Sequence, residues 1–400
     1  MKNPTHDERL ALRQRAREIA AALPPLRRRE DGALTDESRE IVRRQADAIL
    51  RKNRAVGASL VLCGPGGADD VFCFGHARLR PGVPVTESTC FRIASVSKLV
   101  MSFAALSLAE SSLLDLDRDI SDDLGYAVRS PFAPEVPVTM RMLLTHTAGL
   151  TDSGPYGTRG LEGACTLREL LDADESWRDR TPGASFEYSN LGAGVAGVVI
   201  ERAAGQPFDD VLQARVFAPL GIRASYDPRR IVPADDLADG YAVRGPLPPV
   251  CRYDAAALAA RPPEPFDPER DYLCAAGRLI TDSAGMAALV RLLASESGMG
   301  VLAPDSLRLM RTPQDGLGGI GACGRGLNAA FLPGVFPGVN AVGHQGVAYG
   351  MCAELFADPA RGTGVGVMTS GTRLVRTPPL MRAGFDLLTL GFAALAATDQ

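Results

Sequence analysis

The hydrophobic period changes along this chain, and that change most limits the folds open to it. Short apolar runs of the β type lie near both ends, at 58–63, 70–74, 339–343, 350–357 and 364–369. Between them the pattern is mainly helical, with apolar residues recurring at 139–146, 166–173, 191–204 and 208–217. Strands at both ends of a chain with a helical middle predict one mixed domain built from the two termini, with a helical domain inserted.

This pattern divides the chain into three expected parts. Residues 1–35 form an N-terminal helical extension, with an amphipathic helix over 5–23 that Pro24 stops. Residues 36–92 and 273–400 form the α/β domain, with further helices expected at 36–52, at 282–295 and from about 380. Residues 93–272 form the helical domain. Its last part, 226–272, is rich in proline and charge and is expected to be a long loop.

Composition excludes several classes of function. The 400 residues carry 43 basic and 47 acidic side chains, a net charge of −4, which gives no electrostatic footprint for nucleic acid. Residues 1–30 lack the apolar stretch of a secretory signal, and the apolar tail 385–397 is too short to span a membrane. The eight cysteines are scattered without a C-x-x-C pair, so no metal site is expected. These observations favour a cytoplasmic protein that binds neither membrane nor nucleic acid.

Lysine is rare here, and its placement is informative. Only three of the 43 basic residues are lysines, and Lys98 is the one outside the N-terminal segment. It follows Ser95 by three residues, so on a helix the two side chains share a face. A serine hydroxyl becomes a good nucleophile when a neighbouring base takes its proton, and a lysine amine can be that base. A helix-start serine with a solvated lysine is the competing interpretation, and the spacing alone does not separate the two.

Two further segments carry candidate site residues. Tyr188 and Asn190 precede a helix and can both point into one cleft, where a phenol could relay a proton and an amide could hold substrate. A capping asparagine with a packed tyrosine is the competing interpretation. His344 and Gly346 follow a strand; glycine permits close approach, and the next backbone N–H, that of Val347, could stabilise an oxyanion. A lone histidine beside glycines is otherwise a structural residue.

Two other patterns do not support a function. The segment 316–321 matches G-x-G-x-x-G but follows a turn rather than a strand, and no acidic residue lies about 20 positions further on. It is therefore not expected to bind a dinucleotide. No G-x-S-x-G motif is present, which argues against an α/β-hydrolase.

The order of the three motifs resembles the serine β-lactamase and penicillin-binding superfamily, in its class C branch. That group includes class C β-lactamases, D-alanyl-D-alanine peptidases, D-aminopeptidases and β-lactamase-like carboxylesterases. The similarity covers roughly 36–395 and includes the segments 91–98, 143–150, 186–190, 217–221 and 343–346. It implies an α+β fold, with an antiparallel sheet flanked by helices, an inserted all-helical domain, and the active site between them.

The resemblance also implies a role for each matched residue. Ser95 would be the nucleophile, Lys98 its base and Tyr188 the proton shuttle. Asn190 would contact both substrate and lysine, and His344 would face the acylated serine. Gly346 belongs to the same motif, and the backbone N–H groups of Ser95 and Val347 would form the oxyanion hole. Reaction would proceed through an acyl-enzyme, without metal or cofactor.

The third motif departs from many β-lactamases, which have lysine followed by serine or threonine where this chain has His344 and Gln345. Histidine supplies at most a partial charge near neutral pH, so binding of a β-lactam carboxylate is disfavoured. The sequence therefore predicts a serine hydrolase of small esters or amides, as a carboxylesterase, a D-amino-acid amidase or peptidase, or a weak β-lactamase. The alternative is a catalytically silent binding protein on the same fold. An amidase-signature enzyme is disfavoured, because the Gly/Ser-rich core segment of that class is missing.

The N-terminal helix at 5–23 has no counterpart assigned from the resemblance. It is expected to pack either on its own domain or on a second subunit, which would make a homo-oligomer.

Overall fold

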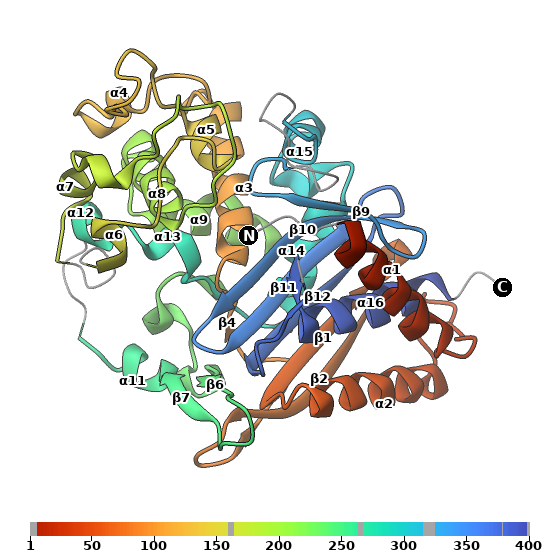
Figure 1. Cartoon of the computed structure of the whole chain (residues 1–400). Coiled ribbons are helices and arrows are strands. Elements are labelled where there is room, and N and C mark those ends of the chain that lie inside the picture. Colours follow the sequence, from red (N-terminus) through yellow and green to blue (C-terminus); the bar gives the residue numbers. More distant parts are fainter. Residues whose placement is uncertain (1–5, 159–163, 263–266, 315–324, 378, 398–400) are drawn as a thin grey trace.

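The computed structural model describes residues 6–158, 164–262, 267–314, 325–377 and 379–397. Its centre is a seven-stranded antiparallel sheet in the order β3-β2-β1-β12-β11-β10-β9 (Figure 1). The strands are β1 Gly57–Cys63, β2 Asp69–Arg78, β3 Val83–Pro84, β9 Ala330–Phe336, β10 Val339–Ala348, β11 Met351–Asp358 and β12 Thr363–Gly371. The expected antiparallel sheet with flanking helices is therefore confirmed.

The two ends of the chain meet in the middle of this sheet. Strand β1 pairs along its length with β12, from Gly57 opposite Gly371 to Cys63 opposite Gly364. Both strands are buried throughout, as central strands covered on both faces are. One domain is thus closed by segments some 300 residues apart, as the β-type runs at both ends predicted.

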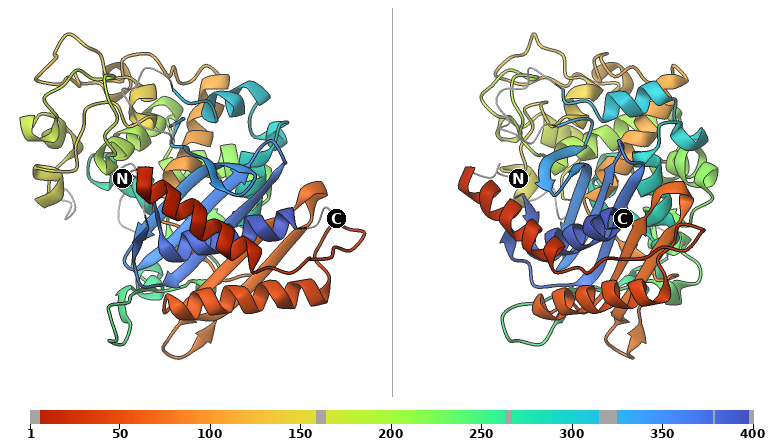
Figure 2. Two further views of the ribbon diagram at one scale, coloured as in Figure 1. Left: turned by 45° about the vertical axis from the view of Figure 1, so that its right-hand side comes forward. Right: turned by 90° about the vertical axis from the view of Figure 1, so that its right-hand side faces the viewer.

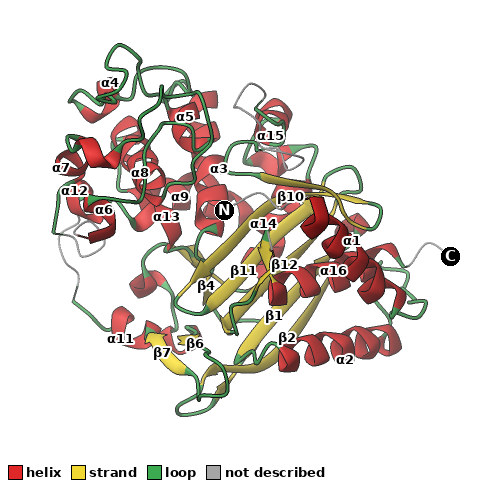
Figure 3. Ribbon diagram, viewed as in Figure 1, coloured by secondary structure: helices red, strands yellow, loops and turns green. Residues whose placement is uncertain are grey.

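Helices cover both faces of the sheet (Figures 2 and 3). Helices α2 Asp36–Lys52 and α16 Arg382–Ala396 lie on one face, and α14 Ser283–Ala294 lies on the other. Successive side chains of β1 point to opposite faces of the sheet. Leu60 joins the cluster under α2 and α16, while Val61 joins the core that includes α14 and the helical part of the chain.

The N-terminal helix packs on its own chain, which is one of the two positions expected for it. Helix α1, His6–Ala21, contacts α16 and β9. Arg15 forms a two-pronged ion pair with the buried Asp386 of α16, with both N–O distances 2.5 Å. A bidentate pair of this kind adds geometric specificity to the apolar contact of the two helices.

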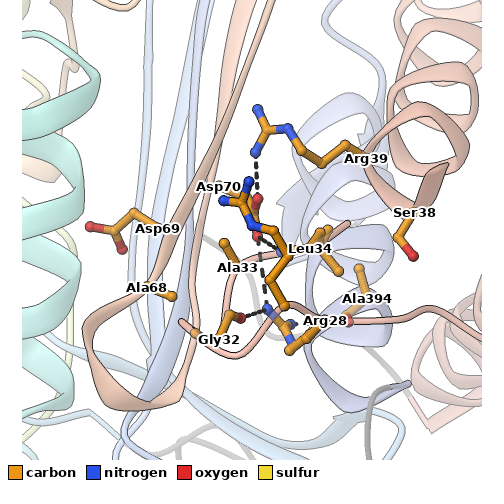
Figure 4. Close-up of polar contacts among 12 residues, drawn as sticks. Arg28, Gly32, Ala33, Leu34, Ser38, Arg39, Ala68, Asp69, Asp70 and Ala394 are labelled. Atoms are coloured by element: carbon orange, nitrogen blue, oxygen red, sulfur yellow. Dashed lines mark hydrogen bonds and ion pairs between the residues drawn. The ribbon is translucent and has the colours of Figure 1, made fainter. Parts of the chain in front are cut away.

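A buried carboxylate anchors the segment that follows α1 (Figure 4). Asp70 of β2 is buried and accepts hydrogen bonds from Arg39 of α2 and, at 3.1 Å, from the backbone N–H of Leu34. Arg28 lies 3.8 Å from the same carboxylate and donates to the Gly32 carbonyl at 2.7 Å. These contacts hold the N-terminal extension against the edge of the sheet domain.

The helical part begins with α3 Val96–Glu110 and includes α5 Met140–Leu144, α7 Leu167–Leu171, α8 Asn190–Ala204 and α9 Phe208–Leu212. Glycines on α8 let another segment approach closely. A Cβ at Gly197 would lie 2.5 Å from the Ala275 side chain, in the short helix α13 Cys274–Gly277. This approach brings α13 beside both α8 and α3.

The expected long loop at 226–272 is wrong in part. It contains the hairpin β6 Gly240–Ala242 and β7 Val250–Tyr253, followed by α11 Ala255–Ala259 and α12 Pro268–Asp271. Its strands are too short for a period to be read, and several prolines lie between them. Strand β9 was also missed because Pro333 and Gly334 interrupt it, which an edge strand tolerates.

Two further features concern membrane spans and metal ligands. No helix within the described residues is long and apolar enough to cross a membrane. Within the same residues, no three histidine, cysteine or acidic side chains cluster as metal ligands would. The segment 316–321 lies outside the described residues.

Candidate active site

Ser95 and Lys98 meet at the start of α3. Lys98 Nζ donates to Ser95 Oγ at 3.1 Å, and the lysine side chain is fully buried. Ser95 is half-buried and its hydroxyl makes no capping bond to the helix. A capping serine with a solvated lysine therefore does not describe this pair. The preceding residue, Ala94, has φ of +47°, a strained backbone that turns the chain sharply into α3.

Two further acceptors surround the lysine. Lys98 Nζ also donates to Asn190 Oδ1 at 2.8 Å and to the Ala276 carbonyl at 2.5 Å. An ammonium has three N–H donors, so these contacts and Ser95 use all of them. Every one of these acceptors is uncharged. Lys98 forms no ion pair with any residue that the structure describes.

The sequence did not point to Asp152, which positions Asn190. Its carboxylate accepts from the Asn190 backbone N–H and from Asn190 Nδ2, both at 2.7 Å, and from the Leu191 N–H at 3.0 Å. Ser189 Oγ donates to it at 3.1 Å while itself capping α8 by accepting from Gly192 N–H. Asn190 is therefore not the capping residue. With its amide nitrogen held by Asp152, its oxygen is directed at Lys98.

We expect Asp152→Ala to lower kcat/KM per folded molecule by tenfold to a hundredfold, since Asn190 would lose the contacts that aim its amide. It should also destabilise the fold by about 2 kcal/mol, because buried donors at the start of α8 lose their acceptor. The matched control is Asp282→Ala, which removes the carboxylate cap of α14. That variant should lose stability only. Equal activity per folded molecule in Asp152→Ala and wild type would contradict the positioning role.

The Tyr188 ring lies among the other candidate groups. Lys98 Nζ is 5.1 Å from the ring centroid, and the His344 ring centroid is 6.2 Å away. The His146 ring packs against Tyr188 at 4.5 Å. The structure thus brings the serine–lysine, tyrosine–asparagine and histidine–glycine segments together, as the sequence predicted.

His146 is a neutral structural partner in this cluster. Burial, reinforced by the nearby Lys98 charge, holds its pKa well below the usual histidine value. Its Nδ1 accepts a hydrogen bond from the Ser189 N–H at 3.3 Å. Since Nδ1 is an acceptor, the ring proton lies on Nε2. The sequence placed His146 in a family-like segment without giving it a role; its contacts show that it packs under Tyr188.

His344 is also neutral. Burial lowers its pKa to about 3, with a smaller contribution from the Lys98 charge. Its Nδ1 lies 2.6 Å from the Gln345 carbonyl oxygen, an acceptor, so Nδ1 carries the proton and Nε2 is left as an acceptor. The partial positive charge that the sequence allowed is therefore absent at neutral pH. Gln345 faces away from this cluster, bonded to the buried Glu354 beside α16.

Gly346 lets β10 touch the start of α3. A Cβ at this position would overlap the Ile93 carbonyl oxygen and lie 2.9 Å from the Ser95 backbone nitrogen. Strand β9 pairs with β10 only from Val339 to Gly343, so the part of β10 beyond Gly343 has no strand partner on that side among the described residues. The half-buried Val347 is the next residue in this part. Its backbone therefore lies beside the candidate nucleophile.

A family model described as Beta-lactamase matches residues 40–383. This chain belongs to the beta-lactamase family. The resemblance read from the three motifs is confirmed.

Two curated proteins are similar in sequence to part of this chain. Esterase EstB of Burkholderia gladioli is 34% identical over 248 residues, which cover 56% of this chain and 62% of the relative. Penicillin-binding protein 4 of Amycolatopsis lactamdurans is 29% identical over 45% of this chain and 46% of its own. The chain thus spans about half to three-fifths of the length of these relatives.

Solved structures show the same fold. EstCE1, titled a hydrolase with promiscuous acyltransferase activity, has a TM-score of 0.70 at 24% identity, covering 96% of this chain and all of that one. A D-amino acid amidase from Ochrobactrum anthropi SV3 has a TM-score of 0.69 at 22% identity, covering 89% and 97%. An octameric penicillin-binding protein homologue from Pyrococcus abyssi has 0.69 at 21%, covering 84% and 74%.

Proposed function

We propose that this protein is a serine hydrolase that cleaves small esters or amides through an acyl-enzyme at Ser95. The observation that carries the proposal is the buried Lys98 amine, which contacts both Ser95 Oγ and Asn190 Oδ1. A hydroxyl beside an amine that a third group orients is the general arrangement of an activated nucleophile.

In the proposed reaction, Lys98 acts in its neutral amine form and takes the Ser95 proton as Oγ attacks the carbonyl carbon. The backbone N–H groups of Ser95 and Val347 stabilise the oxyanion that forms. As the tetrahedral intermediate collapses, Tyr188 delivers its proton to the leaving group, which departs as an alcohol or amine, and Tyr188 takes back the proton that Lys98 received from Ser95. Water then attacks the acyl-enzyme, gives up a proton through the same groups, and releases the acid with Ser95 restored. Tyr188 is the alternative base for the first step.

The state of His344 bears on the choice of substrate. A neutral imidazole with its free lone pair on Nε2 accepts a hydrogen bond and provides no charge for a carboxylate. This favours a substrate that offers an N–H or O–H group near His344. It disfavours a β-lactam, whose carboxylate would lie against an uncharged acceptor. Small esters and neutral amides are therefore preferred to β-lactams.

The names of similar proteins support this substrate class. One curated relative is an esterase and one structural neighbour is a D-amino acid amidase. Both activities use acyl transfer, which the arrangement around Ser95 can perform.

A covalent label tests the proposal directly. We expect wild-type protein to gain the mass of one adduct when treated with a fluorophosphonate, and peptide mapping to place it on Ser95. Ser95→Ala should gain none and should turn over p-nitrophenyl acetate about a thousandfold more slowly than wild type. The alternative, a silent binding protein on this fold, predicts no adduct and no turnover in wild type. Either result would refute the hydrolase.

Two further expectations belong to the proposal. A cytoplasmic location is supported by the thiols, since all the cysteines within the described residues are free and several are buried. A homo-oligomer formed through the outer side of α1 is supported by the exposed Leu10 on that helix. The similar fold of a penicillin-binding protein homologue titled octameric gives this idea a precedent.

A further inference from the structure

A pocket beside the turn after β10 has no part in the proposed reaction. It is an open pocket of about 490 Å³ between three segments, namely the β6–β7 hairpin, the turn after β10 and the residues after β12. The hairpin lies beside the start of β11 and the end of β12 (Figure 3). There the Tyr241 backbone closely approaches Gly350 and Gly371. Three arginines line it, Arg244, Arg252 and Arg373.

These arginines differ from most others in the chain. Arg223 pairs with Asp236 and Asp282, and Arg230 pairs with Asp209 and Asp210. By contrast, the side chains of the three pocket arginines form no ion pair or hydrogen bond with any residue that the structure describes.

The pocket wall supplies no counter-charge. No acidic residue lines it. The nearby Asp239 is bonded to the Tyr241 hydroxyl and the Ala255 N–H, and Asp254 caps α11. Arg373 Nε is moreover buried without a partner, a state that costs free energy unless a ligand satisfies it. Guanidinium groups gathered without acids form a site for an anion, above all a carboxylate or phosphate.

Apolar side chains stand beside these charges. Tyr349 and Leu374 line the pocket and are 51% and 39% exposed, and Leu247 and Val250 of the adjoining hairpin are exposed as well. Large apolar side chains gathered at the surface mark a binding site more often than single ones do. The ligand that fits both features is an anion on an apolar stem.

A stack of side chains joins this pocket to the active site. The Arg92 guanidinium lies 4.9 Å from the Tyr349 ring centroid and 5.2 Å from that of Tyr253. Arg92 precedes Ser95 by three residues. Tyr349 follows Gly346 by three residues and lies just past the end of β10, so their Cα atoms are within about 11 Å of each other. An extended chain of several carbons could therefore reach from a carbonyl at Ser95 into the pocket.

We infer that this pocket binds a carboxylate at the far end of the substrate, so that the enzyme prefers esters or amides with an anionic group on an apolar stem. The inference rests on the proposed hydrolase. His344 is uncharged, and Arg92 is held by the Gly277 carbonyl and the two tyrosine rings, so the pocket arginines provide the positive charge for such a substrate.

The test compares two matched esters, mono-4-nitrophenyl suberate and its methyl ester, which differ only in the distal charge. We expect wild-type kcat/KM to be about tenfold higher for the acid, as one charge-assisted contact would give. In the double variant Arg252→Gln/Arg373→Gln the ratio should fall to near one, whatever happens to the absolute rates. Arg376→Gln removes a nearby exposed arginine that does not line the pocket, and should keep both the ratio and the rates.

The possible outcomes separate this inference from the proposed function. A wild-type ratio near one, or a ratio unchanged in the double variant, would overturn the inference while turnover of both esters upheld the hydrolase. If wild type hydrolysed neither ester, the hydrolase proposal would fail. Titration calorimetry with suberate would then still test the pocket. Binding that the double variant loses and Arg376→Gln keeps would support it, and no binding to wild type would refute it.

Discussion

Lys98→Arg is expected to lower kcat/KM for p-nitrophenyl acetate by about a thousandfold, although it keeps the positive charge. General-base catalysis contributes about 10² to 10⁴-fold, and a guanidinium cannot accept the serine proton at any ordinary pH. The lysine amine also contacts Ser95, Asn190 and Ala276 from one nitrogen. A planar guanidinium presents its donors in a different geometry. It is also larger than the amine that this buried site holds. Both effects act in the same direction.

Two comparisons isolate the chemical effect from a folding defect. Lys52→Arg changes an exposed lysine at the end of α2 and should leave activity and thermal stability unchanged. Ser95→Ala should reduce turnover about as far as Lys98→Arg, because residues that act as a unit do not contribute additively. Activity is to be scaled by the folded fraction from a thermal melt. Undiminished turnover in folded Lys98→Arg would remove this lysine from the mechanism.

Sequence reasoning succeeded where a short local pattern had a spatial consequence. The spacing of Ser95 and Lys98 on a helix placed their side chains together, and the order of the motifs brought Asn190 and His344 to the same site. It failed where a contact joins distant positions. Nothing local connects Asp152 with the start of α8, although it holds Asn190 through two hydrogen bonds at 2.7 Å.

The same limit applies to charge and to short elements. The sequence allowed His344 a partial charge because an isolated imidazole titrates near neutral pH, whereas burial keeps it neutral in the fold. The hairpin β6–β7 has strands of three and four residues, too short to show alternation. The pocket arginines could not be singled out among so many in the sequence. They became distinct once the structure showed that they line one pocket.

Gly346→Ala should lower kcat/KM per folded molecule by about a hundredfold. The added methyl group would overlap the Ile93 carbonyl oxygen, which is backbone and cannot move aside as a flexible side chain could. Strand β10 and the start of α3 must then separate. Their separation would move the Val347 N–H away from the oxyanion that forms at Ser95. A misplacement of about 1 Å in such a site costs about two orders of magnitude in rate.

A second glycine on the same strand distinguishes this effect from general loss of stability. An alanine at Gly343 would overlap the Leu355 carbonyl oxygen of β11, so Gly343→Ala should destabilise the sheet to a similar extent. Its clash lies within the sheet rather than against Ser95, and its folded molecules should keep most of their activity. Rates of fluorophosphonate labelling at Ser95, measured beside chemical denaturation of each variant, separate the two quantities. Equal labelling rates in folded Gly346→Ala and Gly343→Ala would show that the contact between β10 and α3 does not position the oxyanion donors.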